Sequence, residues 1–263
     1  MNLPIYVIDA FSKKPFAGNP AAVVPLDSAG QISDQARASI AEEMKHAETA
    51  YLAPRGGNEF DLRWFTPAVE VDLCGHATLA SAHILWETAR VADGAPIAFF
   101  TRSGKLTATR DGEKIVLDFP AEPVEPSALP FQVACLPAMV FSGRNRMDWF
   151  VEVESAAELR SLEPNFAEIE RLGMRGLIVT SRGDEGYDFV SRFFAPQAGV
   201  PEDPVTGSAH CALAAYWAAK LGKDRMQAFQ ASERGGEVGV RLAGTRVELS
   251  GHAVTVLQGQ LRL

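Results

Sequence analysis

Glu48 is the acidic side chain in this sequence that is best placed to move a proton. It follows the polar stretch Lys-His-Ala at 45–47 and precedes the apolar run Thr-Ala-Tyr-Leu at 49–52, where a loop should enter a strand. A carboxylate at such a position is partly withdrawn from water, which raises its pKa towards the range of a general base. We therefore interpret Glu48 as a general acid/base. The simpler alternative is a solvated acid at the end of a strand.

Two glycines offer the complementary chemistry, a place for negative charge. Gly75 lies in Cys-Gly-His-Ala at 74–77 and Gly207 in Thr-Gly-Ser-Ala at 206–209, and each opens an alanine-rich helical pattern. The first turn of a helix has unpaired N–H groups and a partial positive charge, and glycine lets a ligand approach the backbone. The sequence predicts two anion sites. Alternatively, the glycines only permit close helix packing, and Thr206 or Ser208 caps the second helix.

Three further side chains flank these helix starts. His76 could donate to a substrate oxygen, and the positive end of the helix would keep its imidazole neutral. Asp203 precedes a proline and could position a substrate or only set a turn. Cys74 aligns with Thr206, so a mechanism with a thiol at both helix starts is excluded. Cys74 is either a small buried residue or the base of an epimerase or dehydratase.

A sequence motif and the helix start that follows it both occur twice in the chain, at nearly the same spacing. The frame Arg-x-Phe-x-Pro at 63–67 returns at 192–196, 129 positions later, and the helix starts lie 132 positions apart. Both offsets are close to half of the 263 residues, so we predict two related halves, with residues inserted near 201–203. Leu177 stands 129 positions after Glu48, so the second half has no matching acid. A single base suits one-base proton shuttling better than two-base racemisation.

The elements that must position these residues are mostly short strands. Apolar or alternating runs bounded by turn residues predict strands along the chain, and helical spacing predicts helices at 33–45, 75–90 and 207–220. The last two are apolar almost all round and should be buried. Prolines at 120, 123, 126 and 130 predict a linker.

We therefore predict an α+β fold with two pseudo-symmetric lobes. Each is a curved, mostly antiparallel sheet wrapped around a central helix. The N-terminal lobe spans residues 1–119 and contains Glu48. The C-terminal lobe spans residues 120–263, although its last strand could pack back on the N-terminal lobe.

Composition narrows the class of protein. The formal net charge of −8 and the lack of a basic stripe argue against nucleic acid or an anionic membrane as a partner. No apolar run approaches the roughly 18 residues needed to span a bilayer. Three cysteines predict no disulfide framework and a cytoplasmic location. No zinc motif, dinucleotide fingerprint or P-loop is present, so we predict neither metal nor cofactor.

Several motifs, in order, resemble the phenazine biosynthesis PhzF-like family, a branch of the diaminopimelate epimerase-like superfamily. They are Asp-Ala-Phe (9–11), Phe-Ala-Gly-Asn-Pro-Ala-Ala-Val (16–23), Glu-Thr-Ala (48–50), the frame at 63–67, Glu-Val (70–71), Leu-Cys-Gly-His-Ala-Thr (73–78) and Glu-Asp-Pro-Val-Thr-Gly-Ser-Ala-His (202–210). The resemblance covers nearly the whole chain. It implies a two-lobed fold with the active site in the cleft between lobes, a cofactor-free isomerase acting on a small carboxylate, and a homodimer.

The resemblance also assigns site residues. The catalytic positions fall on Glu48, His76, Asp203 and Ser208. The predicted substrate-binding positions are Gly18, Asn19, Cys74, Gly75, Thr206 and Gly207. The sequence departs from the family pattern in two small ways. Ala47 stands where a serine often precedes the glutamate, and the Arg-Gly-Gly turn at 234–236 matches the family's loop only loosely. This turn is either a hairpin or an anion-binding loop. A ligand-binding protein that keeps the cleft without catalysis is the remaining alternative.

Overall fold

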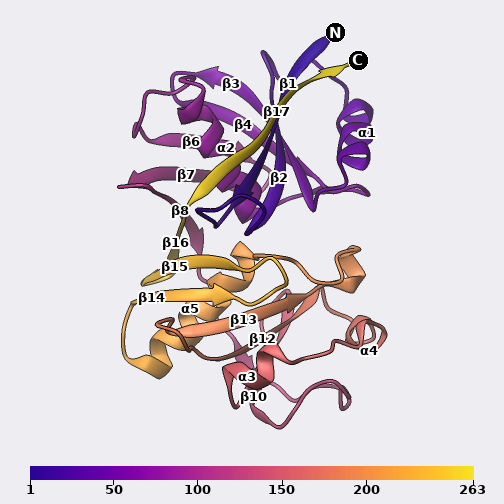
Figure 1. Cartoon of the computed structure of the whole chain (residues 1–263), viewed down its shortest axis with the longest axis vertical. Helices are drawn as coiled ribbons and strands as arrows, with labels where there is room; N and C mark the ends of the chain where they lie inside the picture. The colour runs from indigo at the N-terminus through magenta and orange to yellow at the C-terminus, as the bar shows by residue number, and fades with distance from the viewer. The chain divides into compact units, whose positions relative to one another are not determined.

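The computed structural model describes all 263 residues, which form two compact units (Figure 1). Unit 1 comprises Met1–Asp118 and Ser250–Leu263, and unit 2 comprises Phe119–Leu249. The predicted second lobe continued to residue 263 with the option that its last strand packs back on the first lobe, and the structure places that strand in unit 1. The reason is that β17 (Ala253–Arg262) pairs antiparallel with the full length of β1 (Asn2–Ala10) and satisfies the backbone groups at its edge. Figure 1 shows both termini side by side at the end of this ladder.

Unit 1 is a single mixed sheet with one long buried helix. Its remaining elements are β2 (Asn19–Pro25), α1 (Asp34–Met44), β3 (Glu48–Gly56), β4 (Glu59–Phe65), β5 (Glu70–Val71), α2 (Gly75–Glu87), β6 (Ile97–Thr101), β7 (Gly104–Asp111) and β8 (Lys114–Pro120). The strand order is β17-β1-β2-β3-β4-β6-β7-β8. Only β2–β3 and β4–β6 are parallel.

Unit 2 follows a similar plan. Its elements are β9 (Glu125–Pro126), β10 (Met139–Arg144), β11 (Asp148–Val153), α3 (Ala156–Arg160), α4 (Phe166–Glu170), β12 (Gly176–Arg182), β13 (Phe189–Phe194), the 3₁₀ turn η1 (Pro196–Ala198), α5 (Gly207–Leu221), β14 (Arg225–Gln230), β15 (Gly236–Ala243) and β16 (Arg246–Gly251). Strands β9 to β15 pair in chain order, with β11–β12 and β13–β14 parallel. The proline-rich linker contributes only the two-residue β9, which pairs with β10.

The predicted repeat is present in the topology. The pairings along β1-β2-β3-β4-β6-β7 alternate antiparallel and parallel in the same sequence as those along β10-β11-β12-β13-β14-β15. In each unit a buried helix, α2 or α5, connects the second parallel pair. Antiparallel pairs outnumber parallel ones in both units, and the α+β prediction is confirmed.

The repeated arginine forms the same ion pair in both units. Arg63 on β4 donates from Nε and Nη2 to Glu70, with both distances 2.7 Å. Arg192 on β13 donates in the same way to Glu202, at 2.7 and 2.8 Å. Glu70 and Glu202 lie 132 positions apart, so the residues added in the second copy precede Glu202, where η1 lies.

The central helix α2 is buried on nearly every side, as its composition predicts, and nine of the 15 residues of α5 are buried. Eleven of the 13 residues of α2 are buried, and the helix packs against β1, β2, β3 and β17. Its alanines and serine allow the surrounding strands to approach closely. The helix α5 ends at Gly222, whose φ of +68° is the left-handed conformation that glycine adopts readily at a C-cap. None of the helices has the length and apolar composition required to span a bilayer.

Candidate active site

Glu48 is placed by the end of α1 and the start of β3. Ser33 caps α1 through a bond from the Ala36 N–H to its Oγ, and Lys45 ends the helix with a φ of +53°. This left-handed residue turns the chain into β3, where Glu48 is the first residue and pairs with Ala21 of the parallel strand β2. The Glu48 side chain is 18% exposed. It is therefore largely withdrawn from water and still has a route to solvent.

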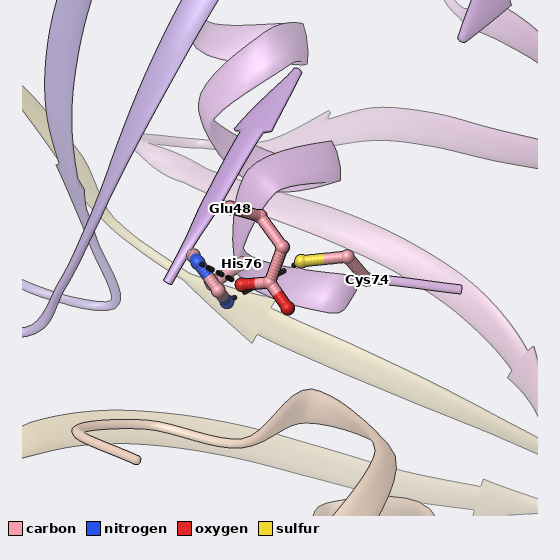
Figure 2. Close-up of side chains that lie close together, drawn as sticks. All are labelled: Glu48, Cys74 and His76. Atoms are coloured by element: carbon pink, nitrogen blue, oxygen red, sulfur yellow. Dashed lines mark hydrogen bonds and ion pairs between the residues drawn. The ribbon is translucent and has the colours of Figure 1, made fainter. Parts of the chain in front are cut away.

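His76 lies against Glu48 in the first turn of α2. Its side chain is 4% exposed, and its Nε2 is 3.3 Å from Oε2 of Glu48 (Figure 2). On the other side of the ring, the amide nitrogen of Asn19 is 3.2 Å from Nδ1. An amide NH₂ can only donate, so with the amide in this orientation Nδ1 accepts and the ring proton is on Nε2, which lies beside the carboxylate without hydrogen-bond geometry to it. In this orientation Asn19 selects the tautomer that leaves the ring N–H next to Glu48, and a half-turn of the amide would select the other one.

Burial keeps His76 neutral. Loss of hydration, with a smaller contribution from the nearby charge of His46, lowers the pKa of His76 to about 3. We predicted a neutral imidazole because of the helix dipole, and the structure gives burial as the larger cause. A neutral imidazole with so low a pKa is a hydrogen-bond donor and a poor base near neutral pH.

Cys74 completes this cluster. It is the N-cap residue of α2, is buried, and makes no side-chain capping bond. Its Sγ is 3.5 Å from Nδ1 of His76. Each of the three residues Glu48, Cys74 and His76 offers one donor atom, and these three atoms all lie within 4.8 Å of one another. The structure therefore gathers predicted residues that are separated by up to 28 positions in the sequence.

The loop before β2 explains Gly18. The φ of Gly18 is +70°, and an added Cβ would lie 2.2 Å from the carbonyl oxygen of Ala10. The same loop is held by a hydrogen bond of 2.6 Å from the Phe16 N–H to Oδ2 of Asp9, which is buried. Gly18 thus shapes the turn that delivers the fully buried Asn19 to His76. Gly75 is the first residue of α2 and is itself buried.

The second helix start has a different set of contacts. Thr206 Oγ1 donates to Oδ2 of Asp203. Gln230 holds this turn from β14: its Oε1 accepts from the Thr206 N–H at 2.8 Å, and its Nε2 donates to the Asp203 carbonyl at 2.7 Å. Thr206 is the N-cap residue but makes no side-chain capping bond, so the capping alternative for it was wrong. Gly207 begins the helix behind this turn.

Ser208 receives a hydrogen bond from an arginine that the sequence did not single out. Nη1 of Arg175 donates to Oγ of Ser208 at 3.0 Å, while Nε and Nη2 bind Asp148, whose side chain is fully buried. A cation therefore reinforces the positive end of α5. Arg175 belongs to no recognisable motif. Gln230 could have been noticed as a polar residue that ends an alternating strand pattern.

The loop 231–235 connects β14 to β15 as a hairpin, because Gln230 pairs with Gly236. Gly235 has a φ of +64°, and its N–H donates to Oγ of Ser232 at 3.1 Å. Ser232 Oγ in turn donates to the carbonyl of Pro204 at 2.8 Å. The hairpin interpretation is confirmed, and the hairpin is fastened to the turn that contains Asp203.

Comparison with known proteins identifies the class. The family model described as phenazine biosynthesis-like protein matches residues 8–259. The chain belongs to this PhzF-like family, whose fold is shared with epimerases. It is 50% identical to an uncharacterized isomerase of Halalkalibacterium halodurans, over 100% of both chains.

Solved structures agree with this assignment. A phenazine biosynthesis protein of the PhzF family from Enterococcus faecalis is 37% identical over 100% of both chains, with a TM-score of 0.94. A hydroxyproline epimerase from Agrobacterium vitis, solved with bound trans-4-hydroxy-L-proline, shares the fold at a TM-score of 0.64. It is 12% identical, over 99% of this chain and 92% of that one.

Proposed function

We propose that this protein is a cofactor-free isomerase that moves a proton on a small carboxylate-bearing substrate, with Glu48 as the general acid/base. One observation carries the proposal. The partly buried carboxylate of Glu48 lies 3.3 Å from the buried, neutral imidazole of His76. The proposal is supported by relatives named as isomerases and by a fold that epimerases share.

In this mechanism Glu48 removes a proton from a carbon next to an unsaturated or carbonyl-conjugated group and returns it at another carbon. The neutral His76 is too weak a base to take that proton, so the proton stays on Glu48 between the two steps. The Nε2–H of His76 and the N–H groups at the start of α2 stabilise the negative charge that develops on the substrate.

We assign Asp203 and Ser208 to holding the substrate's carboxylate or amine, or to relaying protons. Support comes from the contacts of each residue. Because Arg175 already donates to the Ser208 oxygen, the Ser208 hydroxyl proton is left to donate elsewhere. Asp203 is held by Thr206 and Gln230, so its carboxylate is oriented before any ligand arrives.

An epimerase or dehydratase with Cys74 as the base is the second candidate. It is favoured by one contact, the 3.5 Å between Sγ of Cys74 and Nδ1 of His76. Cys74→Ala tests this mechanism, because full turnover in the variant excludes the thiol as the base.

The reaction class is tested with a panel of cyclic and aromatic carboxylic acids. Acids that raise the melting temperature are incubated with protein that has been stripped of small molecules, and the products are analysed by mass spectrometry. We expect a product with the elemental composition of its substrate, formed without any added cofactor. A reaction that proceeds only with an added nicotinamide, flavin or pyridoxal phosphate would contradict the proposal.

A further inference from the structure

The cluster at the start of α2 has the donor set of a zinc site. It offers a carboxylate oxygen from Glu48, a sulfur from Cys74 and an imidazole nitrogen from His76 (Figure 2). Three protein ligands with a fourth position left open is a common arrangement around zinc. Thiol and imidazole donors together favour Zn²⁺ over Mg²⁺ and Ca²⁺, which prefer oxygen.

The separations of the donor atoms suit one ion. Ligand atoms bound tetrahedrally at zinc distances lie about 3.3–3.6 Å apart. Glu48 Oε2 is 3.3 Å from Nε2 of His76, and Cys74 Sγ is 3.5 Å from Nδ1. These short distances involve different ring nitrogens, and one ion takes only one of them. The remaining separations reach at most 4.8 Å, which small side-chain rotations can close.

The backbone places the donors on firm elements. Cys74 and His76 flank Gly75 at the buried start of α2, and Glu48 begins β3. This combination of Cys-x-His with a distant glutamate matches none of the common zinc motifs. The site became visible only when the fold brought the β3 residue to the helix.

Neighbouring groups support the ligands. If Nε2 binds the ion, Nδ1 carries the ring proton, and Asn19 at 3.2 Å can accept it through its amide oxygen after a half-turn of the amide. The carbonyl of Cys74 is held by the Thr78 hydroxyl. An ion would reach the three ligands from solvent past the Glu48 side chain, because this side chain is 18% exposed while that of His76 is 4% exposed.

We propose that Zn²⁺ binds reversibly to Glu48, Cys74 and His76 and inhibits the protein. On binding, the Cys74 thiol loses its proton to solvent, and water or a substrate oxygen takes the fourth position. The metal is an inhibitor, not a cofactor, because a carboxylate bound to zinc cannot accept a proton from carbon. The inhibitory consequence rests on the proposed role of Glu48, whereas the metal site itself does not.

The test uses the full chain after treatment with a chelator. Zn²⁺ is titrated against a chromophoric chelator, and Co²⁺ serves as a spectroscopic substitute. We expect one ion per chain and a near-ultraviolet charge-transfer band from thiolate to Co²⁺. Cys74→Ala should abolish the band and weaken Zn²⁺ binding by at least roughly 100-fold, since loss of supporting residues alone costs up to that much.

Cys211→Ala is the matched control. Cys211 is equally buried but belongs to α5, and its Sγ donates to the Gly207 carbonyl. This variant should keep the stoichiometry, the band and the affinity. Glu48→Gln should weaken zinc binding and keep the thiolate band, and it covers the case in which Cys74→Ala fails to fold.

Absence of binding, or equal zinc affinity in Cys74→Ala and Cys211→Ala, overturns the metal site. Neither readout needs a substrate, so this result leaves the proton-transfer proposal standing. Conversely, full turnover of a substrate by Glu48→Gln contradicts proton transfer by this residue and leaves the metal site standing.

Discussion

Burial, more than charge, decides what the buried histidines can do. The pKa of His76 is lowered to about 3 and that of His210 to about 4, in both cases mainly by burial. His210 lies inside α5, where its Nδ1 is 2.8 Å from the Thr206 carbonyl. Each ring is neutral in the folded protein at pH values where the unfolded chain has begun to bind protons.

This linkage predicts a loss of stability in mild acid. Between about pH 6.5 and the lowered pKa values, the unfolded state binds more protons, so the free energy of unfolding falls as pH falls. Each histidine contributes a slope of up to about 1.4 kcal/mol per pH unit. Urea denaturation of the wild type and of His210→Gln at pH 7.5, 6 and 5 measures how the free energy of unfolding depends on pH. The variant should show the shallower dependence, and identical slopes would refute this account.

The cluster around Glu48 was predictable only in part at the level of residues. Glu48 and His76 stood out because of local pattern and motif. The distance between Glu48 and His76 could not be predicted from the sequence, because it depends on how β3 lies against α2. Arg175 and Gln230 act through long-range contacts with Ser208, Asp203 and Thr206, which no local spacing reveals.

At the scale of elements, the loop that leads into β2 depends on a glycine. Gly18→Ala should destabilise the protein by about 1–3 kcal/mol, because the residue has a positive φ and its Cβ would meet the Ala10 carbonyl. Gly30→Ala is the control, since nothing lies within 4 Å of its added Cβ. Thermal denaturation of both variants is the measurement. Equal melting temperatures would show that the loop adapts.

The repeated arginine pair should hold β13 and its following turn together. Arg192→Met leaves Glu202 without its partner, removes the bond of 2.7 Å to the Leu162 carbonyl, and should cost about 3 kcal/mol. The more exposed pair Arg241–Glu248 provides the comparison, and Arg241→Met should cost less than about 1 kcal/mol. Similar losses in the two variants, by chemical denaturation, would argue against a special role for the repeated pair.

Helices were easier to predict than strand partners. The caps at Ser33 and Gly222 and the periodicity of α1, α2 and α5 are local, and the predicted ranges are close to those observed. The parallel pairs β2–β3 and β4–β6 join strands separated by helices, and their pairing depends on packing across the unit. A pattern of short strands does not specify that order.

At the scale of the whole molecule, the last strand of the chain, β17, pairs with the first, β1. The strand pattern near the C-terminus was evident in the sequence, but its partner was not, because β1 and β17 are separated by nearly the entire chain. The internal repeat was the stronger long-range signal. It predicted two related halves, and the order of pairings in both units follows it.

Removing β17 should therefore damage unit 1 selectively. Deletion of residues 253–263 exposes the edge of β1, so amide hydrogen exchange should accelerate in β1 and β2 while β11 and β12 remain protected. Deletion of Leu263 alone is the control. Unchanged protection of β1 in the longer deletion would mean that β17 does not stabilise unit 1.

The most direct test of the central claim is the turnover of Glu48→Gln beside that of Glu43→Gln, an exposed acid on α1. Glutamine keeps the size of the side chain and removes its ability to accept a proton from carbon. With the first acid that the protein isomerises as substrate, and with folding checked by circular dichroism, Glu48→Gln should lose roughly 100- to 10,000-fold in kcat. Glu43→Gln should retain the wild-type rate. Equal rates in both variants would contradict the assignment of Glu48 as the proton-transferring residue.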